Sequence, residues 1–354
     1  MRRHALWLGA LFFTTVGWAH AQEFIVGADV SFLRQMEGKG IVFKDDGVPL
    51  PGLEILKNHG YNWIRLRIMV DPASLPNDLN YTIASAQAAR KLGFRLLLDF
   101  HYSDDWADPG HQLTPRAWQK QSHARLMKTV FTYTRDTMDA FRKQDVLPDM
   151  VQVGNEVTSG MMWPDGKLPG NWDNFAGLLS AGIRGVYAGC GPSPRPQIMI
   201  HIDKAGNQEA TSWFFDTLDR YHVPFDVIGQ SYYPWWQGTL SDLRNNLAFI
   251  VNKYHKDVII VETAYDWRTG EDLTGKDSAG KVPLFPETPE GQRAFLTALQ
   301  ATVRATPEGH GIGIFWWEPF AEGAIAKRAL FDDQHNALPA IHVFDPASKP
   351  PQNL

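Results

Sequence analysis

Eight short apolar runs alternate along the chain with longer amphipathic segments, and this alternation is the feature that most limits how the chain can fold. The apolar runs are Phe24–Val30, Trp63–Val70, Arg95–Tyr102, Met150–Val157, Gln197–Ile202, Phe225–Tyr232, Val258–Thr263 and Ile312–Trp317. The helix-like segments include Tyr81–Leu92, Arg116–Lys143, Trp172–Tyr187, Asn207–Tyr221, Ser241–His255 and Glu290–Arg304. Continuous apolar strands between helices indicate a parallel sheet covered by those helices. Eight such units predict an α/β fold, a single closed (β/α)8 barrel, in preference to an open doubly wound sheet.

The length and composition agree with one large domain. The chain has 354 residues, of which 21% are charged and 44% hydrophobic, and a barrel of this kind typically needs about 250 residues. No linker or low-complexity tract divides the chain, so residues 22–354 are predicted to form one barrel domain. The chain contains 13 tryptophans, which is a high number for its length. Most should belong to the core, but a Trp near Asp or Glu also suits a sugar-binding cleft, where a flat ring packs on the apolar face of a pyranose.

The first 21 residues have the pattern of a secretory signal peptide. A basic start, Arg2-Arg3, precedes a short apolar segment, and Ala19-His20-Ala21 fits the A-x-A cleavage pattern. The segment is short for a membrane span, although a retained membrane anchor is the alternative. Cleavage after Ala21 would remove both arginines and change the formal charge from −5 to −7. We therefore expect an exported protein, secreted or periplasmic, that does not bind nucleic acid and leaves the membrane once the signal is removed.

One cysteine, Cys190, is present, so the chain cannot form an intramolecular disulfide and must depend on its core for stability. No dinucleotide or phosphate-binding glycine motif, CxxC pair or Gly-x-Ser-x-Gly elbow occurs. We therefore expect no cofactor, and we expect a monomer.

Two glutamates stand at the carboxyl ends of predicted strands. Glu156 follows Met150–Val153 in the sequence Gly154-Asn155-Glu156, and Glu262 ends the run Val258–Val261. A buried carboxylate is costly unless it is paired or functional, so ion pairs and helix caps are the alternative explanation for each glutamate. As a pair on the fourth and seventh strands of a barrel, they match the acid/base and the nucleophile of a retaining glycosidase. Asn155 would hold the sugar 2-hydroxyl beside the acid/base.

Charged and imidazole side chains on neighbouring strands are candidates for the same site. Arg65 and Arg67 alternate on the second strand, so both can face the barrel interior, and a cation there would favour the ionised form of Glu262. The alternative for these arginines is an internal ion pair with Asp99 or another barrel carboxylate. Of the two, Arg65 is the first choice for the cation beside Glu262. His101 and His201 end the third and fifth strands. They could bind sugar hydroxyls or the glutamates, or serve as core residues, whereas a metal site would need more ligands than these strands supply.

Aromatic clusters end the sixth and eighth strands. Tyr233 could donate a hydrogen bond to the nucleophile, and Trp235 and Trp236 could form a stacking platform. Trp316 and Trp317 would bring an indole under the sugar at the cleavage point.

Two loops after strands are long. Residues 103–118, which contain Trp106, are predicted to belong to the binding site, and residues 268–289 are predicted to form a mobile rim. Together with Trp163, Trp235 and Trp236, these loops would set the number of sugar subsites.

The motifs together resemble glycoside hydrolase family 53, the arabinogalactan endo-β-1,4-galactanases of clan A. The matching segments are Gly27-Ala28-Asp29-Val30-Ser31, Asn62-Trp63-Ile64-Arg65-Leu66-Arg67, Asp99-Phe100-His101-Tyr102-Ser103-Asp104-Asp105-Trp106-Ala107-Asp108-Pro109 with Thr114-Pro115 and Trp118, Val153-Gly154-Asn155-Glu156, Ser231-Tyr232-Tyr233-Pro234 and Trp317-Glu318-Pro319. The resemblance implies a barrel glycosidase that cleaves β-1,4-galactan side chains of pectin internally, through a covalent galactosyl-enzyme.

By position in these motifs, the resemblance makes Glu156 the acid/base and Glu262 the nucleophile. It also brings Arg65, His101, Asn155, Tyr233 and Trp317 into the site. Some bacterial members of the family hold calcium after the seventh strand, but residues 266–289 lack a dense acidic pattern here, so we expect no metal. The alternatives are a mannanase or β-glucanase of the same clan, a catalytically silent carbohydrate-binding barrel, and a metal-dependent barrel hydrolase.

Overall fold

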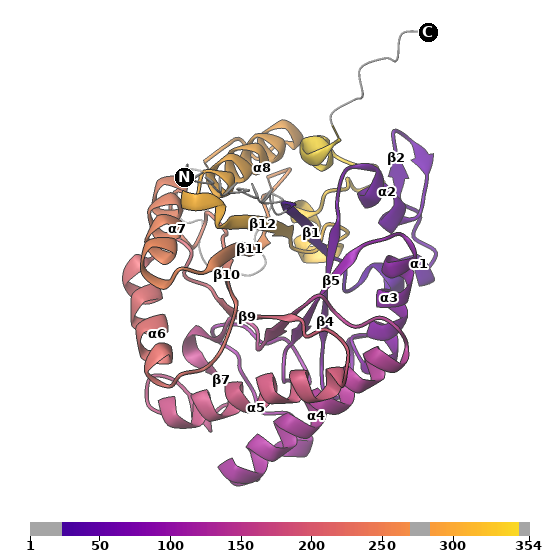
Figure 1. Cartoon of the computed structure of the whole chain (residues 1–354). Helices are drawn as coiled ribbons and strands as arrows, with labels where there is room; N and C mark the ends of the chain where they lie inside the picture. The colour runs from indigo at the N-terminus through magenta and orange to yellow at the C-terminus, as the bar shows by residue number, and fades with distance from the viewer. Residues whose placement is uncertain (1–22, 270–283, 347–354) are drawn as a thin grey trace, which may run out of the picture.

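The structure, a computed structural model, describes residues 23–269 and 284–346. Eight parallel strands close into a barrel in the order β1-β12-β11-β10-β9-β6-β5-β4, and helices surround it as a ring (Figure 1). The barrel strands are β1 (Ile25–Asp29), β4 (Trp63–Ile68), β5 (Arg95–Phe100), β6 (Met150–Val153), β9 (Gln197–Ile202), β10 (Val227–Ser231), β11 (Asp257–Thr263) and β12 (Gly311–Trp316). The predicted (β/α)8 barrel is confirmed. The predicted signal peptide, and residues 270–283 of the predicted rim, lie outside the described residues.

The fourth predicted strand was drawn too long. Val157 was its expected end, whereas β6 stops at Val153. Gly154 has φ 85° and Glu156 has φ 45°, so the backbone turns through the left-handed region, which a strand cannot continue through.

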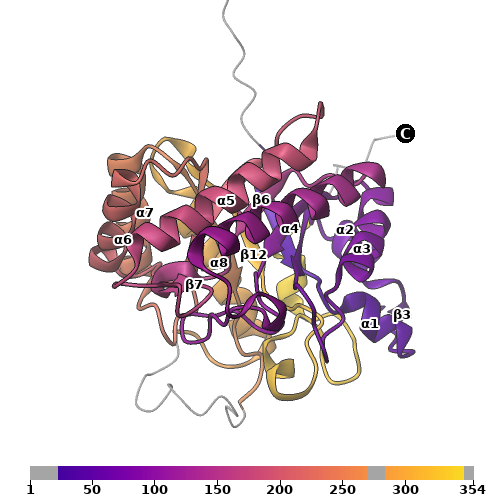
Figure 2. The same cartoon turned by 90° about the horizontal axis from the view of Figure 1, so that it is seen from below.

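The main helices are α3 (Leu79–Lys91), α4 (His123–Lys143), α5 (Trp172–Cys190), α6 (Gln208–Arg220), α7 (Leu240–Tyr254) and α8 (Pro289–Arg304). Capping interactions explain where several of these helices begin. The Asp78 side chain accepts from the Tyr81 amide, Thr239 and Asp242 form a reciprocal capping box, and Thr288 caps a helix whose first residue is proline. Figure 2 shows α4 and α5 running side by side across the outside of the barrel.

Predicting one helix over Arg116–Lys143 was wrong. The 3-10 turn η1 (Arg116–Trp118) is followed by a break at Lys120, where φ is 66°, and α4 begins only at His123. The short helices α1 (Leu33–Gly38) and α2 (Gly52–Asn58) were not predicted, because six or seven residues hold too few turns for a helical period to show.

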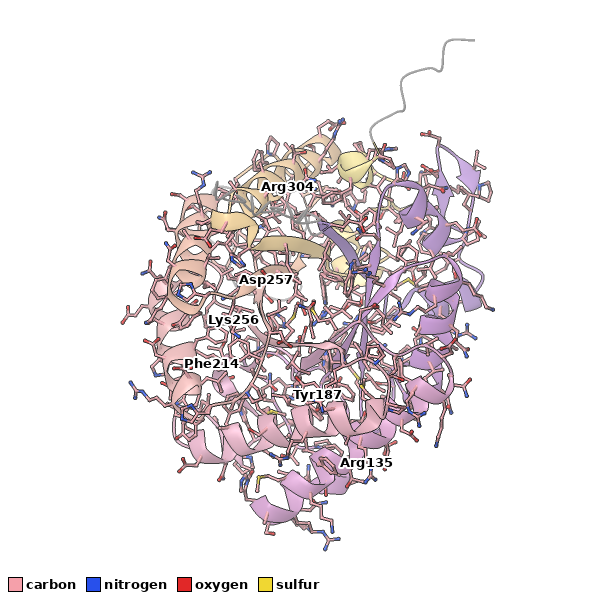
Figure 3. All side chains as sticks on the ribbon, viewed as in Figure 1. Arg135, Tyr187, Phe214, Lys256, Asp257 and Arg304 are labelled. Carbon is pink, nitrogen blue, oxygen red and sulfur yellow. The ribbon has the colours of Figure 1, made fainter. Side chains whose placement is uncertain are left out.

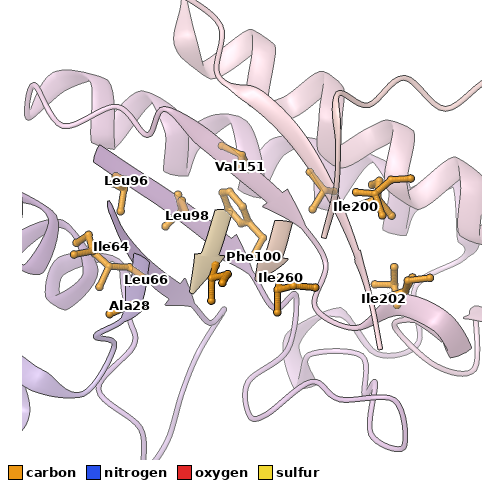
Figure 4. Close-up of a cluster of buried hydrophobic side chains, with 14 of the residues drawn as sticks. Ala28, Ile64, Leu66, Leu96, Leu98, Phe100, Val151, Ile200, Ile202 and Ile260 are labelled. Carbon is orange, nitrogen blue, oxygen red and sulfur yellow. The ribbon is translucent and has the colours of Figure 1, made fainter. Parts of the chain in front are cut away.

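The core has two layers. Ile64, Leu66 and their equivalents on the other strands point outward and pack under the helices; Figure 4 shows this cluster. A smaller cluster, which includes Trp63, Leu97 and Met150, fills the barrel from its amino-terminal end. Figure 3 shows that side chains occupy the whole ring between barrel and helices. Side chains alternate along each strand. The next inward-facing residue therefore lies two positions after each member of this smaller cluster, nearer the carboxyl end of its strand.

Short elements complete the chain. They are the hairpin β2 (Lys44–Asp45) and β3 (Val48–Pro49), the 3-10 turns η2 (Val157–Ser159), η3 (Pro307–Gly309), η4 (Gly323–Arg328) and η5 (Pro339–Phe344), and the hairpin β7 (Gly160–Met161) and β8 (Gly166–Lys167). The amide of Lys44 donates to the carbonyl of His335, so the chain's C-terminal segment lies against the first hairpin. Within the described ranges, no helix is both long and apolar enough to cross a bilayer.

Candidate active site

The carboxyl ends of the barrel strands open into a cleft of about 580 Å³. Both Glu156 and Glu262 line it. The other lining residues are Arg67, His101, Trp106, Ala107, Asp108, Pro109, Asn155, Asp203, Tyr233, Trp236, Gln237, Trp317, Ile325 and Arg328. Glu156 follows β6 and Glu262 lies on β11, strands that are not neighbours in the sheet, and the two glutamates face one shared space.

Glu156 is held in a left-handed backbone conformation at the end of β6, with φ 45° and ψ 50°. This conformation costs a non-glycine residue about 1–2 kcal/mol, and such outliers concentrate at functional sites. Its carboxyl is nearly buried, and Oε1 accepts a hydrogen bond of 2.6 Å from the Ser231 hydroxyl.

A fully buried imidazole lies behind Ser231. His201 Nδ1 is 3.1 Å from the Gln152 amide nitrogen and accepts from the backbone amide of Glu156, while Nε2 is 2.8 Å from Ser231 Oγ. Burial, with the charge of Arg65, lowers the pKa of His201 well below its ordinary value, so the ring is neutral. Nδ1 also lies 3.0 Å from Asn155 Oδ1, but the two donors that face it, the Gln152 amide and the Glu156 backbone amide, favour the tautomer with the proton on Nε2. The chain of donors therefore runs from His201 through Ser231 to Glu156.

Glu262, near the end of β11, is held by a cation and a phenol. Arg65 Nη1 lies 2.7 Å from Oε1, and the Tyr233 hydroxyl donates to Oε2 at 3.1 Å. Both carboxylate oxygens are thus oriented by side chains from other strands.

Arg65 is the centre of a buried ionic network under the cleft. Besides Glu262, it pairs with Asp29 at 2.9 Å and with Asp99 at 2.8 Å, and its Nη2 donates to Asn155 Oδ1 at 2.8 Å. The predicted alternative, an ion pair between Arg65 and Asp99, is therefore present together with the contact to Glu262. Arg67 also pairs with Asp29, at 3.2 Å, so two guanidiniums share these carboxylates. The network links Glu262 on β11 to Asn155, the neighbour of Glu156.

The third-strand loop is anchored to the same network. His101 Nε2 lies 2.9 Å from Asp99, while His101 Nδ1 accepts from the Ala107 amide and Asn155 Nδ2 donates to the Ala107 carbonyl. Trp106, the neighbour of Ala107, is held over the cleft, and the Arg67 guanidinium lies 4.5 Å from the centre of its ring.

The environments of the two glutamates separate their pKa values. Burial, and then the charge of Glu262, raise the pKa of Glu156 well above the ordinary value. Burial also raises the pKa of Glu262, but the Arg65 guanidinium opposes that rise. Of the two carboxyls, Glu156 therefore favours the protonated form more strongly than Glu262 does.

The structure divides the 13 predicted site residues into three groups. Those that line the cleft are His101, Trp106, Asn155, Glu156, Tyr233, Trp236, Glu262 and Trp317. Arg65, Asp99 and His201 lie buried beneath it and contact the lining residues.

Trp235 and Trp316 form the third group and do not line the cleft. Strand alternation explains Trp316: Phe315 points into the barrel, so Trp316 points outward into the core, where its indole donates to the Arg328 carbonyl. Trp235 is nearly buried, with its ring stacked on Tyr265 at 5.6 Å. Trp163, expected to help form subsites, lies against a separate hollow beside Thr114.

Several site residues were not predicted. Ser231 and Gln152 could have been found, because each lies on a strand at the position that faces inward. Arg328 could not, since it comes from η4 after the last strand and reaches the cleft through tertiary packing against Trp235 and Trp236. Asp203 directly follows β9 and pairs with Lys204. No pattern in the sequence marked it as a site residue.

A (β/α)8 barrel with two carboxyls facing one cleft at its carboxyl end is the architecture of the barrel glycosidases. Residues 25–344 match the model of glycosyl hydrolase family 53. The chain belongs to this family.

Individual relatives agree with that assignment. An uncharacterised protein of Niallia circulans is 41% identical over 84% of this chain and 84% of its own length. An arabinogalactan endo-β-1,4-galactanase of Cellvibrio japonicus is 34% identical, covering 93% of this chain and 92% of the relative. A solved structure from a study of two fungal β-1,4-galactanases superposes with a TM-score of 0.83 at 31% identity, covering 90% of this chain and 98% of the other.

Proposed function

We propose that the chain is an exported, endo-acting and retaining β-1,4-galactanase that cleaves galactan side chains of pectin. The observation that carries the proposal is the pair of carboxyls with unequal environments: burial and the charge of Glu262 raise the pKa of Glu156, and Glu262 is ordered by Arg65 and Tyr233. The galactanases of Cellvibrio japonicus and of fungi, similar to this chain over nearly its whole length, support the choice of sugar.

In the first step, Glu262 attacks the anomeric carbon and forms a carbon–oxygen bond to the sugar. The glycosidic bond breaks, and the leaving oxygen takes the proton of Glu156. The raised pKa of Glu156 suits this role because the acid must still be protonated near neutral pH.

In the second step, Glu156, now ionised, removes a proton from water as the water oxygen attacks the same carbon. The bond to Glu262 breaks, and the carboxylate recovers its charge beside Arg65. Two inversions give net retention. Arg65 favours this step because it stabilises the departing carboxylate.

The cleft supports internal cleavage of a chain. Trp106 and Trp317, with ring centres 6.2 Å apart, line it, and so does Trp236, which is 39% exposed. Flat indoles offer stacking surfaces for successive sugars. Asn155, next to Glu156, is proposed to bind the 2-hydroxyl at the cleavage point. Export by the N-terminal signal and a monomeric state complete the proposal, and the net charge of −5 argues against a nucleic-acid partner.

The decisive experiment measures hydrolysis of β-1,4-galactan, β-mannan and carboxymethylcellulose by the purified chain, with products followed over time. We expect galactan oligosaccharides of several lengths at early times, released with the β-anomer retained when products are examined by proton NMR. A preference for mannan or cellulose would assign the enzyme to another activity of the clan, and binding without hydrolysis would make it a silent barrel.

The nucleophile is tested separately. The Glu262→Gln variant should lose turnover while its circular dichroism spectrum stays native, and azide should restore activity to Glu262→Gly by replacing the missing nucleophile. Full activity in either variant without azide contradicts the assignment.

A further inference from the structure

A second cluster of carboxylate and imidazole side chains lies far from the cleft. Asp45, His59 and His342 each offer one atom that could bind a metal ion, and these three atoms lie within 4.8 Å of one another. Asp45 is on β2, His59 directly follows α2 and lies four residues before β4 begins, and His342 is in η5. Since His59 precedes the amino end of β4, the cluster lies at the end of the barrel opposite to Glu156 and Glu262.

A fourth residue orients both imidazoles. The Asp345 carboxylate lies 2.5 Å from His59 Nδ1 and 3.0 Å from His342 Nδ1. If each ring donates to Asp345 through Nδ1–H, each ring offers its lone pair at Nε2. A carboxylate that accepts from the second nitrogen of a histidine is the usual partner of a metal-binding imidazole.

The contact between Asp45 and His59 has the spacing of two ligands of one ion. Asp45 Oδ2 lies 3.1 Å from His59 Nε2. Two ligands of a tetrahedral ion at bonds of about 2.0–2.1 Å are about 3.3 Å apart, close to this separation. Asp45 Oδ1 is also buried and, among the described residues, has no hydrogen-bond partner.

We propose that Asp45, His59 and His342 bind one zinc ion, with Asp345 orienting the two imidazoles and water as the fourth ligand. Two imidazole nitrogens exclude calcium and magnesium, which take oxygen ligands, and two histidines with one carboxylate suit tetrahedral zinc. The ion also balances the two carboxylates. His342 is 35% exposed at its side chain and His59 is 9% exposed, so the site is anchored in the core and open to solvent on one side.

The site joins the two ends of the domain. His59 and Asp345 are 286 positions apart, and η5 approaches α2 closely because Gly60 has no Cβ, which would meet the Phe344 carbonyl oxygen at 2.1 Å. A metal bound only in the folded chain stabilises it through mass action. The proposed zinc is therefore a structural clamp that holds the C-terminal segment against the first hairpin and α2.

The test uses the full mature chain after chelator treatment and dialysis, titrated with zinc chloride in a calorimeter and melted with and without zinc. We expect one zinc per chain and a Tm about 3–5 °C higher at zinc about a hundredfold above Kd. His342→Gln and Asp45→Asn should bind zinc at least tenfold more weakly and lose the Tm rise. Asp345→Asn should keep the stoichiometry with an affinity lower by about 10–100-fold.

His123→Gln is the matched control, because His123 is a partly exposed histidine paired with one aspartate, Asp165, at 2.7 Å. It should bind zinc as the unaltered chain does. The proposal is overturned if the unaltered chain takes up no more zinc than His342→Gln, or if His123→Gln loses binding equally. In that case the contacts of His59 with Asp45 and Asp345 are hydrogen bonds that need no metal ion. Galactan hydrolysis is not the readout, so failure here leaves the proposed activity untouched.

Discussion

Two adjacent tyrosines allow a sharp test of how Glu262 is held. The Tyr233 hydroxyl donates to Glu262 Oε2 at 3.1 Å, and the Tyr232 hydroxyl donates to the carbonyl of Gly238 at the same distance. Tyr233→Phe and Tyr232→Phe therefore remove the same atom and a hydrogen bond of the same length from neighbouring residues. Only the first change affects the proposed nucleophile.

The expected magnitude follows from the kind of bond that is lost. A hydrogen bond to a charged group contributes about 1.5–3 kcal/mol, compared with about 0.5–1.5 kcal/mol for one between neutral groups. Since Glu262 is buried and also paired with Arg65, we expect kcat/KM on galactan to fall by about 10–100-fold in Tyr233→Phe. In Tyr232→Phe, kcat/KM should stay within about twofold, while the unfolding free energy falls by about 1 kcal/mol.

The pH dependence of kcat/KM gives an independent test of the same contact. A hydrogen bond donated to a carboxylate favours its ionised form, so removing the Tyr233 hydroxyl raises the pKa of Glu262. The nucleophile must be ionised, and the acid limb of kcat/KM should therefore move to higher pH in Tyr233→Phe. Initial rates on galactan across pH 3–9, with thermal melts of both variants, measure all of these effects. Equal losses of kcat/KM in the two variants, or an unchanged acid limb in Tyr233→Phe, would refute the reasoning.

Three further changes probe the rest of the site. Ser231→Ala removes the hydroxyl that donates to Glu156 and favours its ionised form. The pKa of Glu156 should therefore rise, and the alkaline limb of the pH–rate profile should move to higher pH. A shift to lower pH would contradict this. Arg65→Met leaves buried carboxylates without their cation and should lower the unfolding free energy by about 3–5 kcal/mol, as measured by urea denaturation; a loss below about 1 kcal/mol contradicts the network. Trp317→Ala removes a stacking surface and should raise KM about tenfold with a smaller change in kcat, whereas Trp213→Ala, exposed on α6, serves as the control with unchanged KM.

The pattern of local residues determined the architecture and the two central acids. Apolar runs with period-two spacing and capped helices specify strands and helices within short stretches of chain, and eight repeats of the unit allow little besides a closed barrel. The carboxyl ends of parallel strands always meet at one end of a barrel. For that reason the sequence alone predicts that Glu156 and Glu262, far apart in the chain, face one cleft, as they do.

Only the tertiary structure decided which side chains reach the cleft. Trp316 and Trp317 look equivalent in sequence, but the register of β12 turns the first into the core and leaves the second in the cleft. Arg328 reaches the cleft from a 3-10 turn, and Ser231 links Glu156 to His201 across two strands. The cluster of Asp45, His59 and His342 depends on the contact between the first hairpin and the chain's end. The reason is physical: short-range periodicity specifies an element and its faces, whereas contacts between distant segments depend on how whole elements pack, which no local pattern encodes.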